Sequence, residues 1–324
     1  ERGQEHVLES LGVTAAAVGA PVDASMDTVR LGRTPGGAEV FAARSAVEAD
    51  GVVLVNRVGL HTGYSGRVQS GLSKMLAVGL GKAPGARALH AHGFGAGHLI
   101  EEAAALSLRE LPPVTAVALL EDGNGRLSEV HFMPGEAVAS SEPALLEKAA
   151  SMWPRIPLAG ADVLLVEEMG KDISGVGMDP HVTGRGIEAA AGPRFETRRL
   201  VVLRLTAGSR GNATGIGHAD ITTAALAGGI DWAATRRNVL TSGALHRARV
   251  PIAADTEKEA VEMVMESLAG LAPEEARVVR IRNTRRLEEF AASEALLPEL
   301  RAVEGLEVVT GGEPLSFSAG GDLL

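Results

Sequence analysis

The sequence predicts an α/β fold made of two α/β domains, with largely parallel sheets and an interdomain cleft. Short β-branched apolar runs alternate with helical runs along the 324 residues, which is typical of helices packed on a largely parallel sheet. This alternation restarts after the proline-spaced segment PRIPLAGA, so we expect domains at residues 1–152 and 153–324. The length suits one large or two medium domains, and a hydrophobic content of 45% is ample for a large core.

The first half contains two predicted hairpins and one predicted buried strand. Turn-forming Pro-Gly-Gly and Asp-Gly-Asn-Gly segments interrupt two β-rich runs, VRLGRTPGGAEVFA and VTAVALLEDGNGRLSEVHFMP. The run ADGVVLVNRV is continuously apolar, which predicts a strand buried on both faces. The opening run ERGQEHVLESLG has the pattern of a helix joined partway along, so we expect the first domain to be truncated at its N-terminus.

Helices are predicted from apolar residues that recur with a period near 3.6. In the first half these are residues 70–80, GHLIEEAAALSLREL before Pro112, and EPALLEKAASMW. In the second half the strands DVLLVEEM and RLVVLRLT lead into glycine-rich loops, followed by two helices, the helix EKEAVEMVMESLAGL and the strand ARVVRIR. The run TRRLEEFAASEALLPEL predicts a long last helix that returns to the first domain.

Charge and cysteine content exclude several classes of function. The net charge is −10 and there is no basic tract, which disfavours a nucleic-acid partner and an anionic membrane. The absence of cysteine excludes disulfides, thiolate catalysis and metal sites with cysteine ligands. No apolar run reaches the roughly 18 residues of a membrane span, and the start is not a signal peptide, so we expect a cytoplasmic protein.

A glycine- and serine-rich segment follows the first predicted buried strand. In α/β sheets ligands bind beyond the carboxyl ends of strands, and free N–H groups at a helix start bind phosphate. We therefore predict a phosphate-binding segment made of Gly63, Ser65, Gly66, Ser70 and Gly71. The alternative is a turn that only caps the following helix.

Lys74 lies inside an apolar helical run of the same segment. Burial lowers the pKa of a lysine, which makes its amine a nucleophile or a covalent anchor. The alternative is a side chain that extends its ammonium to water from the helix edge.

Histidines are concentrated in the same part of the chain. His61, His90, His92 and His98 are four of the nine histidines and fall within 38 residues. Neutral imidazole is a natural ligand for late transition metals, and it also transfers protons near neutral pH. This clustering predicts a metal or acid–base site, with chance as the alternative.

His61, the motifs GYSG and SGLSKM with Lys74, and then His90 resemble the nickel-pincer-dependent lactate racemase family, in a branch nearer to hydroxyacid isomerases. In that family a pyridinium mononucleotide with thioamide and thiocarboxylate groups is tethered through a lysine. Nickel is bound by the pyridinium carbon, two sulfurs and one histidine. The resemblance implies Lys74 as catalytic tether and His90 as nickel ligand, with His92 as the alternative ligand. It implies His61 as the general base that takes the substrate hydroxyl proton while hydride passes to the cofactor.

The resemblance covers most of the chain and has two departures. The spacing from His61 to Lys74 is a few residues longer than in the racemase. The family's second catalytic histidine and an arginine would lie before Glu1, where this chain starts. If the chain is a fragment, we expect it to bind the cofactor without turnover; if it is complete, a two-base racemisation lacks its second base.

A second-domain loop, MGKDISGVGMDPHVTGR, follows a predicted buried strand. Its mixed charges predict binding of the substrate carboxylate across the cleft, with Lys171, Asp172 and Arg185 as substrate-binding residues. The alternative is a solvated surface loop. In the next loop we favour a structural role for Asn212, Thr214 and His218, with Asp220 as a helix N-cap, and His246 is expected to be an ordinary loop residue.

These observations give three hypotheses of different classes. The first is a racemase or epimerase of a 2-hydroxy acid, in which the second domain closes over the substrate and cofactor-synthesis proteins are partners. The second is a zinc or iron enzyme with His61, His90 and His92 as ligands. The third is a non-catalytic cofactor-binding protein. The sequence does not identify the hydroxyacid.

Overall fold

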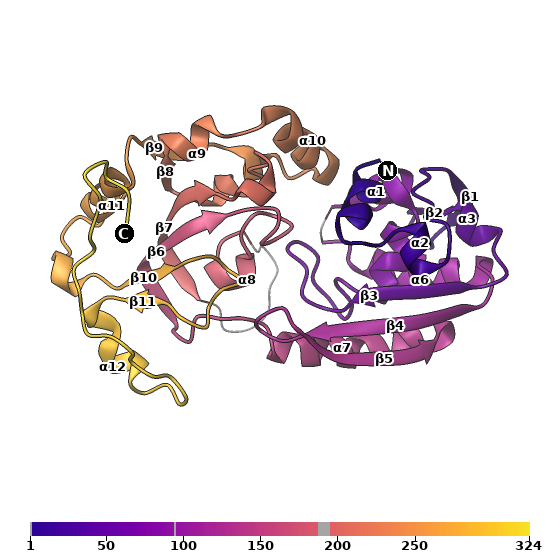
Figure 1. Cartoon of the computed structure of the whole chain (residues 1–324). Helices are drawn as coiled ribbons and strands as arrows, with labels where there is room; N and C mark the ends of the chain where they lie inside the picture. Colours follow the sequence, from indigo (N-terminus) through magenta and orange to yellow (C-terminus); the bar gives the residue numbers. More distant parts are fainter. Residues whose placement is uncertain (1, 94, 187–194) are drawn as a thin grey trace. The chain divides into compact units, whose positions relative to one another are not determined.

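The computed structural model describes residues 2–93, 95–186 and 195–324, with side chains from residue 5 (Figure 1). The chain divides into two compact units. The first comprises Glu1–Leu60, Tyr64–Leu120 and Glu129–Lys148. The second comprises His61–Gly63, Glu121–Ser128 and Ala149–Leu324. The interdomain cleft stays a prediction.

The strands of the first unit form two small sheets. β1 (Thr28–Arg33) and β2 (Glu39–Ala43) are an antiparallel hairpin, as predicted, closed by a bond from Gly37 N to Thr34 O. β3 (Val52–Arg57), β4 (Val114–Glu121) and β5 (Leu127–Pro134) follow one another in a second sheet, in which β3 and β4 are parallel. The predicted turn between β4 and β5 is confirmed, because Asp122 N donates to Arg126 O.

Strand β3 corrects one expectation. Its apolar run was expected to be buried on both faces, yet Val53 is 70% exposed and Val55 is 53% exposed. Leu54, which points to the other face, is 3% exposed. β3 is an edge strand, so a continuous apolar run does not by itself place layers on both sides of it.

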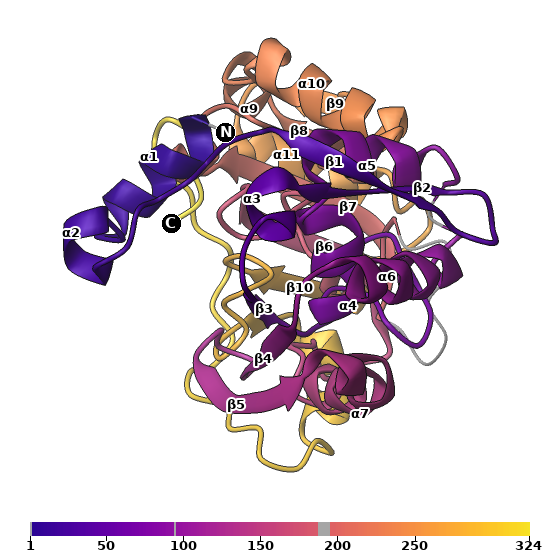
Figure 2. The same cartoon turned by 90° about the vertical axis from the view of Figure 1, so that its right-hand side faces the viewer.

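The helices of the first unit are centred on α6 (His98–Glu110), which ends before Pro112 as predicted. Figures 1 and 2 show the β1–β2 hairpin on one side of α6 and the sheet of β3 to β5 on the other. The remaining elements are α1 (Arg2–Ser10), α2 (Ala15–Val18), α3 (Arg44–Val47), α4 (Leu72–Lys74), the π-helical η1 (Met75–Gly79), α5 (Lys82–His90), η2 (Gly135–Ala137) and α7 (Val138–Ser151). Aliphatic side chains from β2, η1, α5 and α6 form the core, together with Tyr64.

The second unit is built on a six-stranded sheet with the order β11-β10-β6-β7-β8-β9. The five strands from β10 to β9 are parallel and β11 is antiparallel at one edge, which confirms a largely parallel α/β sheet. Their bounds are β6 (Gly160–Met169), β7 (Glu196–Leu205), β8 (Ile221–Thr223), β9 (Ile252–Ala254), β10 (Val278–Ile281) and β11 (Ala291–Ala292). Alternate residues of β6 and β7 enter two separate cores, so both faces of the central strands are buried.

Helices cover both faces of this sheet. α11 (Glu257–Glu266) contributes to one core, while α9 (Ala224–Gly228) and α12 (Leu297–Leu300) contribute to the other. The other helices are α8 (Pro180–Thr183), α10 (Trp232–Ser242) and the 3-10 turns η3 (Ala207–Ser209), η4 (Ile216–His218), η5 (Leu245–Ala248), η6 (Pro273–Glu275) and η7 (Glu294–Leu296).

The long last helix expected for residues 284–300 is wrong. Ala291 and Ala292 instead pair with β10 as strand β11, and the helix that follows has only four residues. This segment belongs to the second unit. Pairing with a sheet edge outweighs the helical propensity of the charged run.

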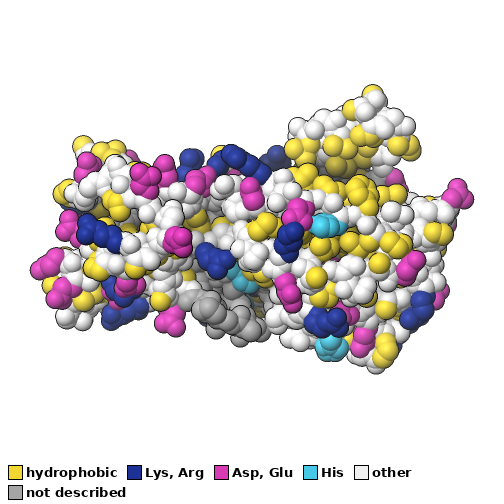
Figure 3. All heavy atoms as spheres, turned by 90° about the horizontal axis from the view of Figure 1, so that it is seen from below, with side chains coloured by type: hydrophobic (Ala, Val, Ile, Leu, Met, Phe, Trp, Pro, Cys, Tyr) yellow, Lys and Arg dark blue, Asp and Glu magenta, His cyan; other side chains and the backbone are white. Residues whose placement is uncertain are grey.

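The surface carries mixed charge on the face in Figure 3, where Lys and Arg side chains are interspersed with Asp and Glu. Among the described residues, no helix combines the length and the hydrophobicity that crossing a membrane requires.

Candidate functional site

Lys74 lies at the junction between α4 and the π-helical turn η1. Met75 N donates to Gly71 O in the first turn, and Leu80 N then donates to Met75 O in the π register. Leu72 and Leu76 on either side are fully buried. A π turn inside a helix is often found at a functional site.

The side chain of Lys74 is partly buried. Burial lowers the pKa of Lys74 from 10.5 to about 8, and burial is the sole cause. Within the described part of the chain no hydrogen bond or ion pair to the Lys74 amine is found. A pKa near 8 leaves about half of the amines neutral at that pH, which is the nucleophilic form. Partial burial without a partner distinguishes Lys74 from a lysine that extends fully into water.

The start of α4 is closed by a carboxylate from a distant helix. Glu142 of α7 accepts hydrogen bonds at Oε2 from Ser73 N (2.8 Å) and Ser73 Oγ (2.5 Å). Ser70 N donates to Gly59 O (3.2 Å), and Gly71 lies against Glu142 Oε1. The predicted phosphate site is therefore corrected at Ser70 and Gly71, because the chain's own oxygens already fill it.

The other three predicted phosphate-binding residues have different surroundings. Gly63 N donates to His61 Nδ1 (3.0 Å), so it is not available either. Gly66 has a φ of +128°, a conformation that requires glycine. A Cβ on Gly97, at the start of α6, would lie 2.4 Å from Ser65 O, so this loop packs closely on that helix start. Ser65 and Gly66 are thus the two left to serve a phosphate.

His90 is the last residue of α5 and lies in the same unit as Lys74. Its ring stacks on Tyr64, with centroids 6.1 Å apart and an interplanar angle of 25°. Ala77 of η1 and Leu89 of α5 share one core, so the π turn that follows Lys74 packs on the helix that ends at His90. Burial raises the pKa of Tyr64 to about 12, so its hydroxyl stays protonated.

The alternative metal ligands belong to different units. His92 is exposed just after α5, and His61 belongs to the second unit. In the portion of the chain that the structure describes, no group of three or more His, Cys, Asp or Glu side chains is placed to hold a metal ion. A zinc or iron site made of His61, His90 and His92 stays a prediction.

His61 lies in a three-residue loop that packs with the second unit. Arg247 Nη2 donates to Thr62 O (3.0 Å), and His181 Nε2 lies 3.2 Å from His61 O. Because His61 Nδ1 accepts from Gly63 N, a neutral His61 ring carries its proton on Nε2. The loop backbone is therefore held at two carbonyls and the tautomer of its histidine is set.

Lys171 lies in the loop after β6, at the carboxyl end of that strand. Its Nζ donates to Gly175 O and to Asn238 Oδ1 (2.9 Å). Burial and then the charge of Arg247 lower the pKa of Lys171. Lys171 and Arg247 are therefore two neighbouring cations, and the oxygens that accept from Lys171 are neutral. Such a pair of cations suits the binding of a carboxylate.

Arg185 and Asp172 are bonded within the protein rather than free for substrate. Arg185 pairs with Asp220 (2.8 Å) and also donates from Nε to Thr197 O (2.9 Å). Asp172 accepts from the Thr206 hydroxyl. Their predicted substrate contacts are therefore corrected: both side chains hold loops together.

Asp220 is also not a helix N-cap. It accepts from Leu200 N (2.8 Å) and precedes strand β8, while Thr223 caps α9 by accepting from Leu226 N. Turn-like residues precede a helical run in the sequence, and the strand between them has only three residues, too few for a recognisable pattern.

Several residues near this site were not expected from the sequence. Arg247 is 5% exposed, and no local pattern in the sequence marks it. Asp179 is 9% exposed and accepts from His181 N (2.8 Å) and Trp153 Nε1 (2.9 Å). Burial raises the pKa of Asp179. In the sequence, the Asp-Pro pair that starts α8 is the feature that indicates the position of Asp179.

The loop after β7 carries a buried histidine. Asn212 Oδ1 accepts from Thr214 N and Oγ1, in line with the structural role expected for both. His218 Nε2 is buried without a partner in the described residues, and its ring lies 5.5 Å from His246. Burial, together with the charges of Arg247, His246 and Arg185, lowers the pKa of His218 to about 4.

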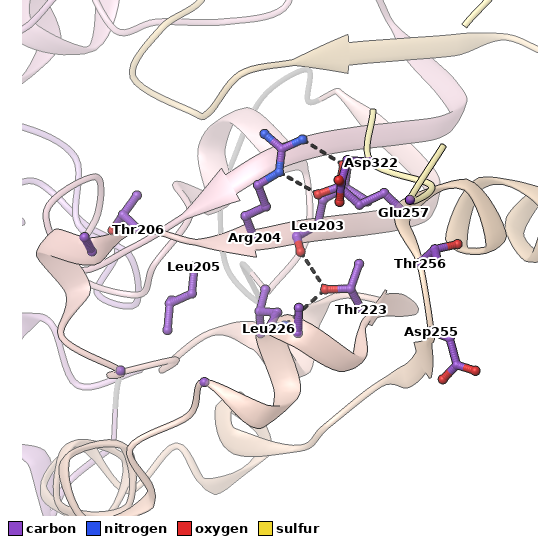
Figure 4. Close-up of a pocket in the computed structure, with 15 residues that line it drawn as sticks. Leu203, Arg204, Leu205, Thr206, Thr223, Leu226, Asp255, Thr256, Glu257 and Asp322 are labelled. Carbon is purple, nitrogen blue, oxygen red and sulfur yellow. Dashed lines mark hydrogen bonds and ion pairs between the residues drawn. The ribbon is translucent and has the colours of Figure 1, made fainter. Parts of the chain in front are cut away.

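A pocket of about 430 Å³ lies elsewhere, at the carboxyl ends of β7, β8 and β9 (Figure 4). Arg204 faces Glu257 in this pocket and pairs with it through two bonds of 2.5 and 2.7 Å. Asp255 and Asp322 add two further carboxylates. Because acidic groups outnumber basic ones there, the pocket does not suit a hydroxyacid, and none of the predicted site residues lines it.

Comparison with known proteins gives distant structural likeness alone. No family model matches the chain, and no curated protein matches it. Among solved structures it is similar to the lactate racemase apoprotein from Thermoanaerobacterium thermosaccharolyticum, with 12% sequence identity and a TM-score of 0.43. The likeness covers 82% of this chain and 70% of the other. At this level it carries no argument about reaction or cofactor.

Proposed function

We propose that the protein is a racemase or epimerase of a 2-hydroxy acid that acts through a nickel-pincer nucleotide tethered to Lys74. The observation that carries the proposal is the side chain of Lys74: it is partly buried, lies between two buried leucines at a π turn, and has a pKa lowered to about 8. A structural lysine gains nothing from such a position, whereas a covalent anchor requires it.

The residues of the first unit fit this group in part. Lys74 would form the covalent link and His90 would be the single imidazole ligand of nickel, which is consistent with the lack of a larger ligand cluster in the described residues. The phosphate fits less well, because the donors at the start of α4 are taken and Ser65 and Gly66 remain. When bound, the cofactor would supply the hydride-accepting carbon.

The residues of the second unit would bind and orient the acid. Lys171, supported by the charge of Arg247, would hold the substrate carboxylate. His61 would exchange the hydroxyl proton at its ring, and the bonds from Arg247 and His181 to the loop carbonyls would keep that ring in place.

The test is intact mass, peptide mapping and nickel analysis on protein co-expressed with cofactor-synthesis enzymes. We expect an adduct on Lys74 and about one nickel per chain. Lys74→Ala should lose both, His90→Ala should lose nickel and keep the adduct, and His61→Ala should keep both and lose turnover. An adduct on another lysine would refute the proposal.

A second candidate, a cofactor-binding protein without turnover, is favoured by the His61 ring. With Nδ1 bonded to Gly63 N, a neutral His61 presents an N–H at Nε2 instead of a lone pair. To act as a base at Nε2, it would have to give up that bond. A loaded preparation that exchanges no substrate α-proton for any hydroxyacid supplied would support this candidate.

A further inference from the structure

We infer that Glu142 is a positioning residue for Lys74, fixing the start of α4 from a helix 69 residues away in the sequence. The inference rests on the proposed role of Lys74 as the attachment site. It concerns a residue that no local motif marks, since Glu142 lies in the ordinary helical pattern of α7.

The bonds from Glu142 reach both donors of one residue. Its Oε2 accepts from the backbone N–H and from the hydroxyl of Ser73, and the side chain is 1% exposed. A helix start usually obtains this acceptor from a local Ser, Thr, Asn or Asp at the N-cap. Here the N-cap is Gly71, which has no side chain, so Glu142 supplies the acceptor from outside.

Gly71 shows how closely Glu142 is seated. Its φ of 174° is extended backbone that any residue adopts, so conformation does not require glycine there. A Cβ on Gly71 would lie 1.9 Å from Glu142 Oε1. The position is therefore restricted to glycine by contact with the carboxyl group.

This arrangement is more costly than a local cap. Oε1 is buried without a hydrogen-bond partner in the described residues, and burial raises the pKa of Glu142. Burying an unpartnered polar atom costs free energy. A cap that served stability alone would avoid this cost. The cost indicates that the cap positions a neighbouring residue.

Lys74 is that neighbour. It directly follows Ser73 and precedes the π turn, so Lys74 alone lies between the residue bonded to Glu142 and the change in helix register. Because no bond to the Lys74 amine is found among the described residues, its direction depends on the backbone that Glu142 holds. Loosening this turn would let the amine reach water.

The elements packed against α4 include α6 and β3. Their charged groups are His98, Glu101, Glu102, Arg109, Glu110 and Arg57. Of these, Glu101 raises the pKa of Glu142 further, and none is a cause of the shift at Lys74. A change in the pKa of Lys74 on substitution of Glu142 would therefore report solvent access rather than a lost charge pair.

The test uses the full chain without cofactor. Lysines are acetylated with acetic anhydride between pH 6 and 11, and peptide mapping gives the pH midpoint of each. We expect a midpoint near 8 for wild-type Lys74 and a rise toward 10.5 in Glu142→Ala, which lowers its neutral fraction at pH 8 by about 100-fold. Glu142→Gln keeps an acceptor for Ser73 N and should leave the midpoint near 8.

Glu147→Ala, at an exposed position on the same helix, is the matched control and should change nothing. If Glu142→Ala does not fold by circular dichroism, Ser73→Ala and Gly71→Ala make the same test, with a smaller rise for Ser73→Ala. A folded Glu142→Ala with an unchanged midpoint overturns the inference. A wild-type midpoint near 10.5 instead overturns the proposed role of Lys74, so the two failures are distinct.

Discussion

Two lysines of this protein, one in each unit, have lowered pKa values for different reasons. The Lys74 amine is shifted by burial alone and has no bonding partner among the described residues. Lys171 is shifted by burial and by Arg247, and it donates to Gly175 O and Asn238 Oδ1. The first is a partly buried lysine whose amine is poised to react, whereas the second joins a loop to a helix and presents a charge.

The comparison implies contributions of different size to stability. A buried ammonium without partners destabilises the folded state. Two hydrogen bonds from a buried lysine to the protein offset part of that cost. Substituting each lysine by methionine, which has similar length and no charge, should therefore raise the free energy of unfolding more at Lys74 than at Lys171.

The largest effect is expected for Lys74→Met. Between pH 8 and 10.5 the unfolded chain holds a proton that the folded chain has lost, so wild-type stability rises with pH through this window. The difference between 10.5 and about 8 corresponds to about 3 kcal/mol, which the variant should gain below pH 8. Urea unfolding of both proteins at pH 7 and 10.5 measures it, and equal stabilities at pH 7 would contradict the comparison.

His218 allows the same comparison of folding stability to be made at acidic pH. Its pKa is lowered from 6.5 to about 4, so between these values the unfolded chain binds a proton that the folded chain does not. Wild-type stability should fall by up to about 3 kcal/mol as pH decreases from 6.5 to 4. His218→Gln should lack this part of the decline. The measurement is urea unfolding of both proteins over this range, and parallel pH profiles would show that His218 is solvated.

A smaller effect is expected for Lys171→Met. Loss of the bonds to Gly175 O and Asn238 Oδ1 should offset most of the gain from removing a buried charge, so stability at pH 7 should change by less than about 1 kcal/mol. If Lys171→Met were as stabilising as Lys74→Met, the two lysines would be equivalent and the distinction between them would fail.

Local patterns in the sequence account for one side of this comparison. Lys74 was recognisable because a lysine interrupts an apolar helical run, and the glycine-rich segment before it marked a helix start. The parallel sheet of the second unit was recognisable from its β-branched runs. Both predictions depend on the hydrophobic period and the turn-forming residues of a short segment, and no distant contact enters into them.

The partners of these residues depend on contacts that are distant in sequence. Glu142 reaches Ser73 across 69 residues, and Arg247 reaches Thr62 across 185. Arg185 had the charge of a substrate ligand, but Asp220, 35 residues later, neutralises it. A sequence shows which side chains are charged; which of them are neutralised is decided by tertiary pairing. For that reason the predicted phosphate and carboxylate sites needed correction.

The smallest effect is expected for Lys258→Met, which sets the baseline for both lysines. The Lys258 side chain is 56% exposed and pairs with Glu262 on the same helix at 3.7 Å. An exposed pair of this kind contributes less than about 0.5 kcal/mol, and salt screens it further. We therefore expect the urea midpoint of this variant to match wild type at pH 7 and at pH 10.5. A gain at pH 7 comparable to that of Lys74→Met would show that removing any positive charge stabilises this protein, and burial would no longer explain the behaviour of Lys74.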